Sequence, residues 1–176
     1  MALRCASLLS LMLSAAIFGF FYAWVCSTMW GLDAVDPVVA VEAMQAMNAS
    51  VRNAVFGPAF FGTGPLLILT SLIAWQAGAR GAAYAFGTGG IIYLVGGMGL
   101  TLAVNVPMNE TLAGYVAEVE SAAEVWADYS PRWQAWNVAR TVASGAAVLM
   151  VGIGLMQLPG APNLTAASRR ARPGRT

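Results

Sequence analysis

Four long apolar segments constrain this chain more than any other feature of its sequence. They cover about residues 6–29, 60–77, 82–104 and 133–158 of the 176. Each is long enough to cross a hydrocarbon core of about 30 Å as an α-helix. With 59% hydrophobic and only 10% charged residues, the chain leaves no segment for a second, soluble domain. The sequence therefore predicts an all-α fold, an antiparallel bundle of four transmembrane helices forming a single domain over residues 1–160.

The first apolar segment has a second interpretation, as a secretory signal peptide. Small residues around Ser14 would suit a signal peptidase, but the apolar stretch continues through Phe18 to Val25. That length exceeds the apolar core of an ordinary signal peptide. We therefore predict that the first segment is retained as a membrane span.

Charged residues are sorted between alternate connections of the predicted bundle. All nine basic residues are arginines, and six of them fall at the N-terminus, in the turn near residue 80 and in the tail, namely Arg4, Arg80, Arg169, Arg170, Arg172 and Arg175. The eight acidic residues fall in the two other connections. Since cytoplasmic loops of membrane proteins are enriched in basic residues, this pattern predicts a multi-pass protein of the cell membrane with both termini cytoplasmic. Residues 161–176 are predicted to be a disordered basic cytoplasmic tail near the lipid headgroups, and nothing indicates nucleic acid as a partner.

The two acidic connections are predicted to contain short amphipathic helices. In the first, Asp36-Pro37 is typical of an N-cap followed by proline at the first helical position. In the second, the helix that carries Glu124 and Asp128 is expected to end near Ser130-Pro131. Pro107 is expected to break the outer end of the third span, because proline lacks a backbone donor.

The chain has no histidine, which excludes histidine-ligated haem, histidine-based zinc or copper sites and any nucleophile paired with histidine. The two cysteines, Cys5 and Cys26, would lie about 32 Å apart on one helix and so do not bond to each other. We predict no metal and no cofactor.

Arg140 is the most informative residue of the fourth span. A guanidinium facing lipid costs about 2.5 kcal/mol or more at mid-depth, so a polar partner is expected. Asn137, Arg140, Thr141 and Ser144 share one helical face, and this stripe is predicted to point into the bundle. Two interpretations remain open: a functional site, or an arginine that only reaches the interface or clamps the helices.

An aromatic cluster precedes that stripe and also allows two interpretations. Trp126, Tyr129, Trp133 and Trp136 lie within eleven positions. Such a cluster is typical of the aromatic belt at a membrane surface. It is equally suited to form the wall of a site for a flat, apolar ligand.

Three motifs together resemble those of the anthrone-oxygenase-like family of small four-helix membrane proteins. They are Met44-Gln45-x-x-Asn48 with Arg52, Asn105-Val-Pro-Met-Asn109, and Trp126-x-x-Tyr129-x-x-x-Trp133-x-x-Trp136-Asn137-x-x-Arg140. The resemblance extends from about Tyr22 to Ala147, and some members of the family are linked to aromatic polyketide pathways. It implies a shared polar pocket lined by Gln45, Asn48, Arg52, Asn105, Asn109, Trp136, Asn137 and Arg140. Val138 stands where many members have histidine.

The resemblance implies cofactor-independent oxygenation of a hydrophobic, polyketide-like aromatic substrate. The catalytic set would be Arg140, Asn137, Asn105 and Asn109, with the arginine stabilising an anion and the asparagines orienting oxygens. The substrate-binding set would be Gln45, Asn48, Arg52, Trp133, Trp136 and Tyr129. Asp33, Asp36, Glu110, Tyr22 and Tyr129 are the candidate bases.

Other functions remain open at this stage. A membrane-bound cyclase or isomerase of a lipophilic substrate would use the same acid and base groups. A non-catalytic protein that binds lipophiles or a partner subunit would use the polar cluster only to lock its helices. An oligomer is compatible with all of these hypotheses.

Overall fold

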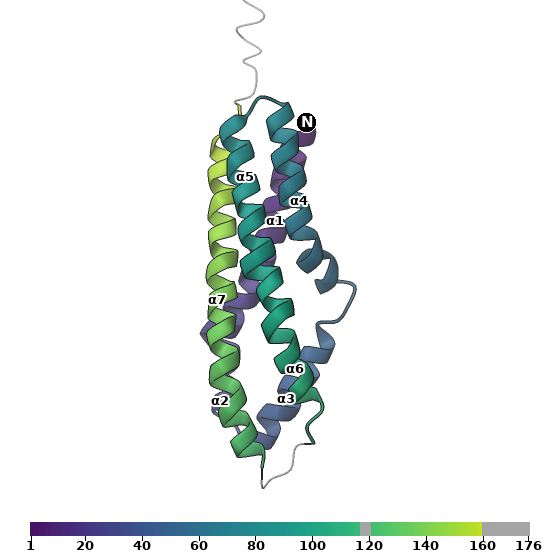
Figure 1. Ribbon diagram of the computed structural model, residues 1–176, viewed down its shortest axis with the longest axis vertical. Helices are drawn as coiled ribbons and strands as arrows, with labels where there is room; N and C mark the ends of the chain where they lie inside the picture. The colour runs from purple at the N-terminus through teal and green to yellow at the C-terminus, as the bar shows by residue number, and fades with distance from the viewer. Residues whose placement is uncertain (117–120, 160–176) are drawn as a thin grey trace, which may run out of the picture.

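Four long helices make up the bundle in the computed structural model, which describes residues 1–116 and 121–159. They are Ala2–Asp33, Phe56–Gln76, Arg80–Ala113 and Ala122–Met156, and each is long and apolar enough to cross a membrane (Figure 1). Within the described ranges the chain forms no strand. The structure confirms the predicted all-α, four-helix fold. The predicted tail, residues 161–176, lies outside the described residues.

Two of the long helices change from α to π geometry along their length. The first consists of α1 (Ala2–Ala23), the π-helix η1 (Trp24–Thr28) and α2 (Met29–Asp33). The third consists of α5 (Arg80–Ile92), η2 (Tyr93–Gly99), η3 (Thr101–Asn105) and α6 (Val106–Ala113). The second helix is α4 (Phe56–Gln76) and the fourth is α7 (Ala122–Met156). Because π turns are rare and often occur at functional sites, η1 and η3 mark a region of interest.

The four helices form an antiparallel ring in which α1 contacts α4 and α7, and α5 contacts the same two helices. The N-terminus and the turn between α4 and α5 lie at one end of the bundle (Figure 1). The end of α7 joins them there, because the Arg4 guanidinium donates to the carbonyl of Pro159 at 3.4 Å. Gly78 adopts a φ of +76° in the α4–α5 turn, a conformation that favours glycine.

A short helix, α3 (Pro37–Ser50), lies at the opposite end and contacts α2, α6 and α7. The Asp36 carboxylate accepts from the Val38 N–H at 2.9 Å, and Pro37 is the first helical residue. This confirms the predicted N-cap. Ala40, Val41 and Met44 are fully buried, so the apolar side of α3 fixes it to the bundle.

The expected helix end near Ser130-Pro131 is wrong, because α7 continues through Pro131 without a break. Glu124 and Asp128 therefore belong to the first turns of the fourth long helix, not to a separate helix. Side chains on both sides of the proline bind one carboxylate of α2. Asp33 accepts from Trp126 Nε1 at 3.0 Å, Ser130 Oγ at 2.6 Å and Gln134 Nε2 at 2.9 Å. These tertiary bonds hold the helix across a residue that lacks a backbone donor.

Pro107 likewise does not end the third helix, which continues to Ala113. The Val106 N–H bonds to the carbonyl of Thr101, five residues back, as in a π turn. Pro107 follows at the start of α6, where its missing N–H has little effect. The π turn thus accommodates the proline, and the predicted break is replaced by a change of helix type.

The buried apolar residues form two clusters that meet near the middle of the bundle. One lies between α1, α4, α5 and α7 and includes Phe21 and Phe60. The other lies at the α3 end and includes Trp24 and Trp133. Phe20 packs against both clusters. Where they meet, these aromatic side chains surround the cavity described below.

Close packing of the third helix on α7 depends on small residues. A Cβ added at Gly96 would lie 2.6 Å from the Cβ of Ala143 on α7. We expect Gly96→Val to destabilise the bundle by about 1–3 kcal/mol, because the helices must separate to accept the larger side chain. Reversible unfolding by sodium dodecyl sulfate in mixed micelles, followed by circular dichroism, measures the effect.

The matched control for that experiment is Gly19→Val, because a Cβ at Gly19 of α1 meets no other side chain within 4 Å. It should leave stability nearly unchanged. Equal stability of the two variants would show that the third helix and α7 are not closely packed at Gly96.

Candidate functional site

Arg140 of α7 lies inside the bundle, with only 5% of its surface exposed. Its Nε donates to Asn137 Oδ1 at 2.8 Å, and its Nη1 donates to Thr101 Oγ1 at 3.4 Å. The guanidinium carbon lies 4.3 Å from the ring centre of Phe21 and 4.9 Å from that of Trp133. Asn137, Thr141 and Ser144 are buried too, which confirms that the polar stripe points into the bundle.

The buried guanidinium has no carboxylate partner among residues 1–116 and 121–159. The two ion pairs found there join Arg52 to Glu110 and Arg132 to Asp128. Neutral oxygens and aromatic faces are thus the groups that surround Arg140 in the described chain. A buried positive charge is normally paired, so the arrangement has an unused capacity to bind an anion.

Asn109 is the centre of a second polar group, which links three helices. Its Oδ1 accepts from Tyr129 Oη and from Trp133 Nε1, both at 2.8 Å. Its Nδ2 donates to Asn48 Oδ1 of α3 at 3.0 Å. The Asn109 carboxamide therefore fixes the ring of Trp133 beside Arg140 and ties α3 to α6 and α7.

Two asparagines keep buried atoms without a hydrogen-bond partner in the described part of the chain. Asn105 is completely buried, and neither its Nδ2 nor its Oδ1 has a partner. Asn48 Nδ2 is also buried and unpaired. Because buried polar atoms almost always bind something, these carboxamides are suited to hold water or the polar atoms of a ligand.

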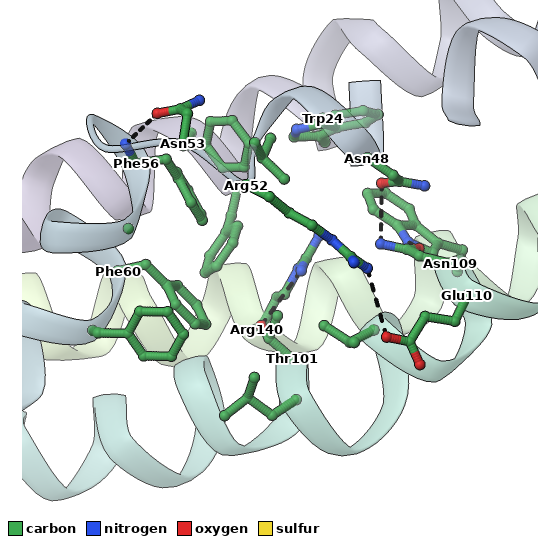
Figure 2. Close-up of a pocket in the computed structure, with 18 residues that line it drawn as sticks. Trp24, Asn48, Arg52, Asn53, Phe56, Phe60, Thr101, Asn109, Glu110 and Arg140 are labelled. Carbon is green, nitrogen blue, oxygen red and sulfur yellow. Dashed lines mark hydrogen bonds and ion pairs between the residues drawn. The ribbon is translucent and has the colours of Figure 1, made fainter. Parts of the chain in front are cut away.

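A cavity of about 360 Å³ lies between these polar groups and the N-terminal half of α4. Its walls are mainly aromatic side chains of the first helix, of α4 and of α7. These are Phe20, Phe21, Trp24, Phe56, Phe60 and Trp133. The polar groups on its walls are Asn48, Arg52, Asn53, Thr101, Asn109, Glu110 and Arg140. Figure 2 shows Arg140 and Thr101 facing Phe60 and Phe56 across this space. The volume of the cavity and its lining suit a flat aromatic molecule that carries a few oxygen atoms.

An ion pair spans one side of the cavity. Arg52 Nη2 lies 3.6 Å from Glu110 Oε1, and both side chains are largely exposed. Figure 2 shows the Arg52 side chain reaching over the cavity toward Glu110. Asn53 shapes the same loop, because its Oδ1 accepts from the backbone N–H groups of Val55 and Phe56. The loop between α3 and α4 thus carries a charged cover for the cavity.

The model of the anthrone oxygenase family matches residues 44–150, more than half of the chain. The chain belongs to the anthrone oxygenase family. The match includes the C-terminal half of α3, the polar centre at Asn109 and the whole Trp133–Arg140 region, and it confirms the resemblance that the motifs indicated. No curated protein and no solved structure matched this chain. Family membership and the four spans together indicate an oxygenase-like membrane protein.

The structure of this family member places some of the predicted site residues on the cavity and others away from it. Asn48, Arg52, Asn109, Trp133 and Arg140 line the cavity directly. Asn137 lies behind Arg140, where its Nδ2 donates to the carbonyl of Phe21 at 3.2 Å. Tyr129 lies behind Asn109 and binds it. Asn105 is buried and does not reach the cavity wall.

Two predicted substrate-binding residues point elsewhere. Gln45 Nε2 donates to the carbonyls of Leu112 at 2.7 Å and Tyr115 at 2.8 Å, so it ties α3 to the end of α6. Trp136 is 44% exposed and lies outside the cavity lining. Trp133, one helical turn earlier on α7, is only 1% exposed and lines the cavity. Trp136 is thus placed like a membrane-belt residue, and Trp133 is the ring at the site.

Among the candidate bases, Glu110 is the carboxylate that lines the cavity in the described chain. Asp33 is bound to three side chains of α7, and Asp36 caps α3. Tyr22 is half exposed and away from the cavity. No cluster of three His, Cys, Asp or Glu side chains suited to a metal ion occurs in residues 1–116 and 121–159.

Several lining residues were missed by the sequence analysis. Thr101 precedes Asn105 and Asn109 at intervals of four, so helical spacing alone would have placed it on their face. Phe20 and Trp24 of the first helix, and Phe56 and Phe60 of α4, show the same interval. In a chain with this many apolar residues, a spacing of four between two of them is common. Which aromatic rings meet at the cavity depends on how the helices pack against one another.

Proposed function

We propose that this membrane protein oxygenates a hydrophobic aromatic substrate without a cofactor, and that Arg140 stabilises the substrate's oxyanion. The observation that supports this most is a buried guanidinium without a carboxylate partner, held beside two aromatic rings at a cavity of matching size. Charge-assisted hydrogen bonds from a preorganised cation are effective where negative charge develops. The family's name identifies anthrones as the first substrates to test.

The proposed reaction balances without any further reagent besides dioxygen. A base removes a proton from the ring carbon opposite the carbonyl, and the negative charge moves onto the carbonyl oxygen beside Arg140. The resulting carbanion reduces dioxygen and bonds to it, and the peroxide takes the proton back from the base to become a ring hydroperoxide. Loss of water then gives a second carbonyl, so one anthrone and one dioxygen yield one quinone and one water.

Glu110 is the proposed base, because it is the carboxylate on the cavity wall in the described chain. Figure 2 shows Glu110 and Arg140 at different places on that wall. A flat substrate lying along the aromatic side chains would present its carbonyl to Arg140 and its acidic carbon toward Glu110. Arg52, which pairs with Glu110, would position the carboxylate.

The test is oxygen consumption by the detergent-purified protein with a panel of anthrones and hydroquinones. We expect one dioxygen consumed per quinone formed. Glu110→Gln should lower kcat by about 10²–10⁴, the usual contribution of a general base, while ligand binding remains. Glu42→Gln, a change at an exposed carboxylate of α3 away from the cavity, is the matched control and should leave kcat unchanged.

Other outcomes would favour the alternatives. Conversion of a ligand without oxygen uptake would favour a cyclase or isomerase. Binding without any conversion would favour a non-catalytic lipophile-binding protein. Either result would contradict the proposed oxygenase. An active enzyme would be consistent with a role in aromatic polyketide metabolism, since polyketide ring systems fit the proposed ligand class.

We also propose that the termini are cytoplasmic, so that the cavity lies toward the outer leaflet. Arg4 and Arg80 lie at the end that carries the N-terminus and the α4–α5 turn (Figure 1). Asp33, Asp36, Glu42 and Glu110 lie toward the opposite end. This distribution follows the enrichment of basic residues in cytoplasmic loops.

A further inference from the structure

One side of the cavity has apolar side chains that are also on the surface of the bundle. Phe61 of α4 and Leu102 of η3 both line the cavity, yet 54% and 45% of their surfaces are exposed. A side chain that borders a cavity and is half exposed stands at an opening. Gly57 lines the same cavity, and a Cβ added there would meet nothing within 4 Å.

The helices on the two sides of this opening diverge. In the described chain α4 contacts α5 and η2, but it contacts neither η3 nor α6. Figure 1 shows the first turns of α4 bending away from the run of helix that ends in α6. The opening between Phe61 and Leu102 is therefore lateral, between two membrane-spanning helices, and is not at the end of the bundle.

Its depth places the opening within reach of lipid. At about 1.5 Å per residue, Phe61 lies about 22 Å along α4 from Gln76, and Leu102 about 33 Å along the third helix from Arg80. Gln76 and Arg80 flank the turn at the opposite end of the bundle. With a hydrocarbon core of about 30 Å, the opening extends from within the hydrocarbon to its boundary with the headgroups at the α3 end.

Two polar contacts cross the side of the cavity that faces the α3 end of the bundle. The Arg52–Glu110 ion pair joins the loop after α3 to α6, and Asn48 of α3 accepts from Asn109 of α6. The polar links thus lie on the side toward water, and apolar side chains border the opening toward lipid.

From this arrangement we infer that the ligand is a neutral, membrane-dissolved aromatic molecule that enters laterally between α4 and η3, past Phe61 and Leu102. This inference rests on the proposed function and names the form and route of its substrate. A neutral ketone can cross an apolar opening, and its charge develops only beside Arg140 when the ring carbon is deprotonated. A permanently charged analogue would have to enter past the Arg52–Glu110 pair.

The test measures binding kinetics of the full-length protein in phosphatidylcholine vesicles, with 1-hydroxyanthraquinone and its sulfonate as probes. Trp24 and Trp133 line the cavity, so quenching of tryptophan emission reports probe binding in a stopped-flow experiment. We expect the association rate of the neutral probe to follow its concentration in the lipid. The sulfonate should bind at least about tenfold more slowly.

Variants at the opening should change both rate constants together. Phe61→Ala widens the opening and should raise association and dissociation rates several-fold. Gly57→Leu fills open space there and should lower the association rate by about tenfold. The matched controls are Leu69→Ala, which removes a 52% exposed side chain of α4 away from the cavity, and Gly152→Leu, which also enters open space. Both should behave like the wild type.

The inference is overturned if Phe61→Ala and Gly57→Leu bind the neutral probe at wild-type rates. It is also overturned if Arg52→Gln, and not Phe61→Ala, accelerates binding, because the ligand would then enter from the water side. Failure of the wild type to bind either probe at equilibrium would instead contradict the proposed function, so the two failures are distinguishable.

Discussion

Arg140→Gln is expected to lower kcat/KM for an anthrone by about 10²–10³, the effect of removing a donor that stabilises a developing oxyanion. Glutamine retains a polar side chain that can bond to Asn137, so the fold should survive. The variant loses the positive charge that is buried beside Phe21 and Trp133. Steady-state oxygen consumption, with circular dichroism as the check on folding, measures the effect.

Arg80 supplies the matched control. Its guanidinium carbon lies 3.7 Å from the ring centre of Trp75, so it also stacks on an aromatic side chain, but at the other end of the bundle (Figure 1). Arg80→Gln should leave kcat/KM unchanged. Arg140→Lys should restore part of the activity, because it returns the charge without the planar geometry of the guanidinium. A folded Arg140→Gln protein with wild-type turnover would show that the buried charge only stabilises the bundle.

Asn109→Leu is expected to have the largest effect on stability, a loss of about 3 kcal/mol. The substitution leaves the Tyr129 hydroxyl and the Trp133 indole N–H without their acceptor and Asn48 without its donor. Each buried polar group left unpaired costs about 1–3 kcal/mol, and water entering from the cavity offsets part of the sum. Unfolding by sodium dodecyl sulfate in mixed micelles measures the loss.

Asn109→Asp separates the contributions within that network. Aspartate keeps an acceptor for Tyr129 and Trp133 but loses the donor to Asn48. We expect it to retain more stability than Asn109→Leu and to loosen mainly the attachment of α3. If both variants are as stable as the wild type, the Asn109 carboxamide does not hold the three helices together.

The four spans could be predicted because length and apolar character alone decide whether a segment can cross a bilayer. The inward direction of Arg140 followed from the same physics, since a guanidinium and its polar neighbours avoid lipid. The ends of the helices could not be predicted from the sequence in the same way. Local rules for Pro107 and Pro131 predicted breaks, but a π turn accommodates the first, and bonds to Asp33 carry α7 across the second.

The composition of the site was only partly predictable for a related reason. The sequence motifs pointed to Asn48, Asn109, Trp133 and Arg140, and all four line the cavity. Asn109 also holds Trp133 in place by accepting a hydrogen bond from its indole N–H. They also selected Gln45, whose side chain is used to tie α3 to α6. A hydrogen bond between two helices and a hydrogen bond to a ligand require the same polar residue types. The type of a residue therefore does not show which of these two roles it has.

The sequence by itself determined the number of helices, their antiparallel order and the burial of a charged stripe on the fourth helix, because these depend on the transfer of each segment between water and lipid. Only the tertiary structure decided that Glu110 and not Asp33 reaches the cavity, that Trp133 and not Trp136 stands beside Arg140, and that the cavity opens between α4 and η3. These features depend on how side chains from different helices meet, and that geometry is set by packing between residues far apart in the chain.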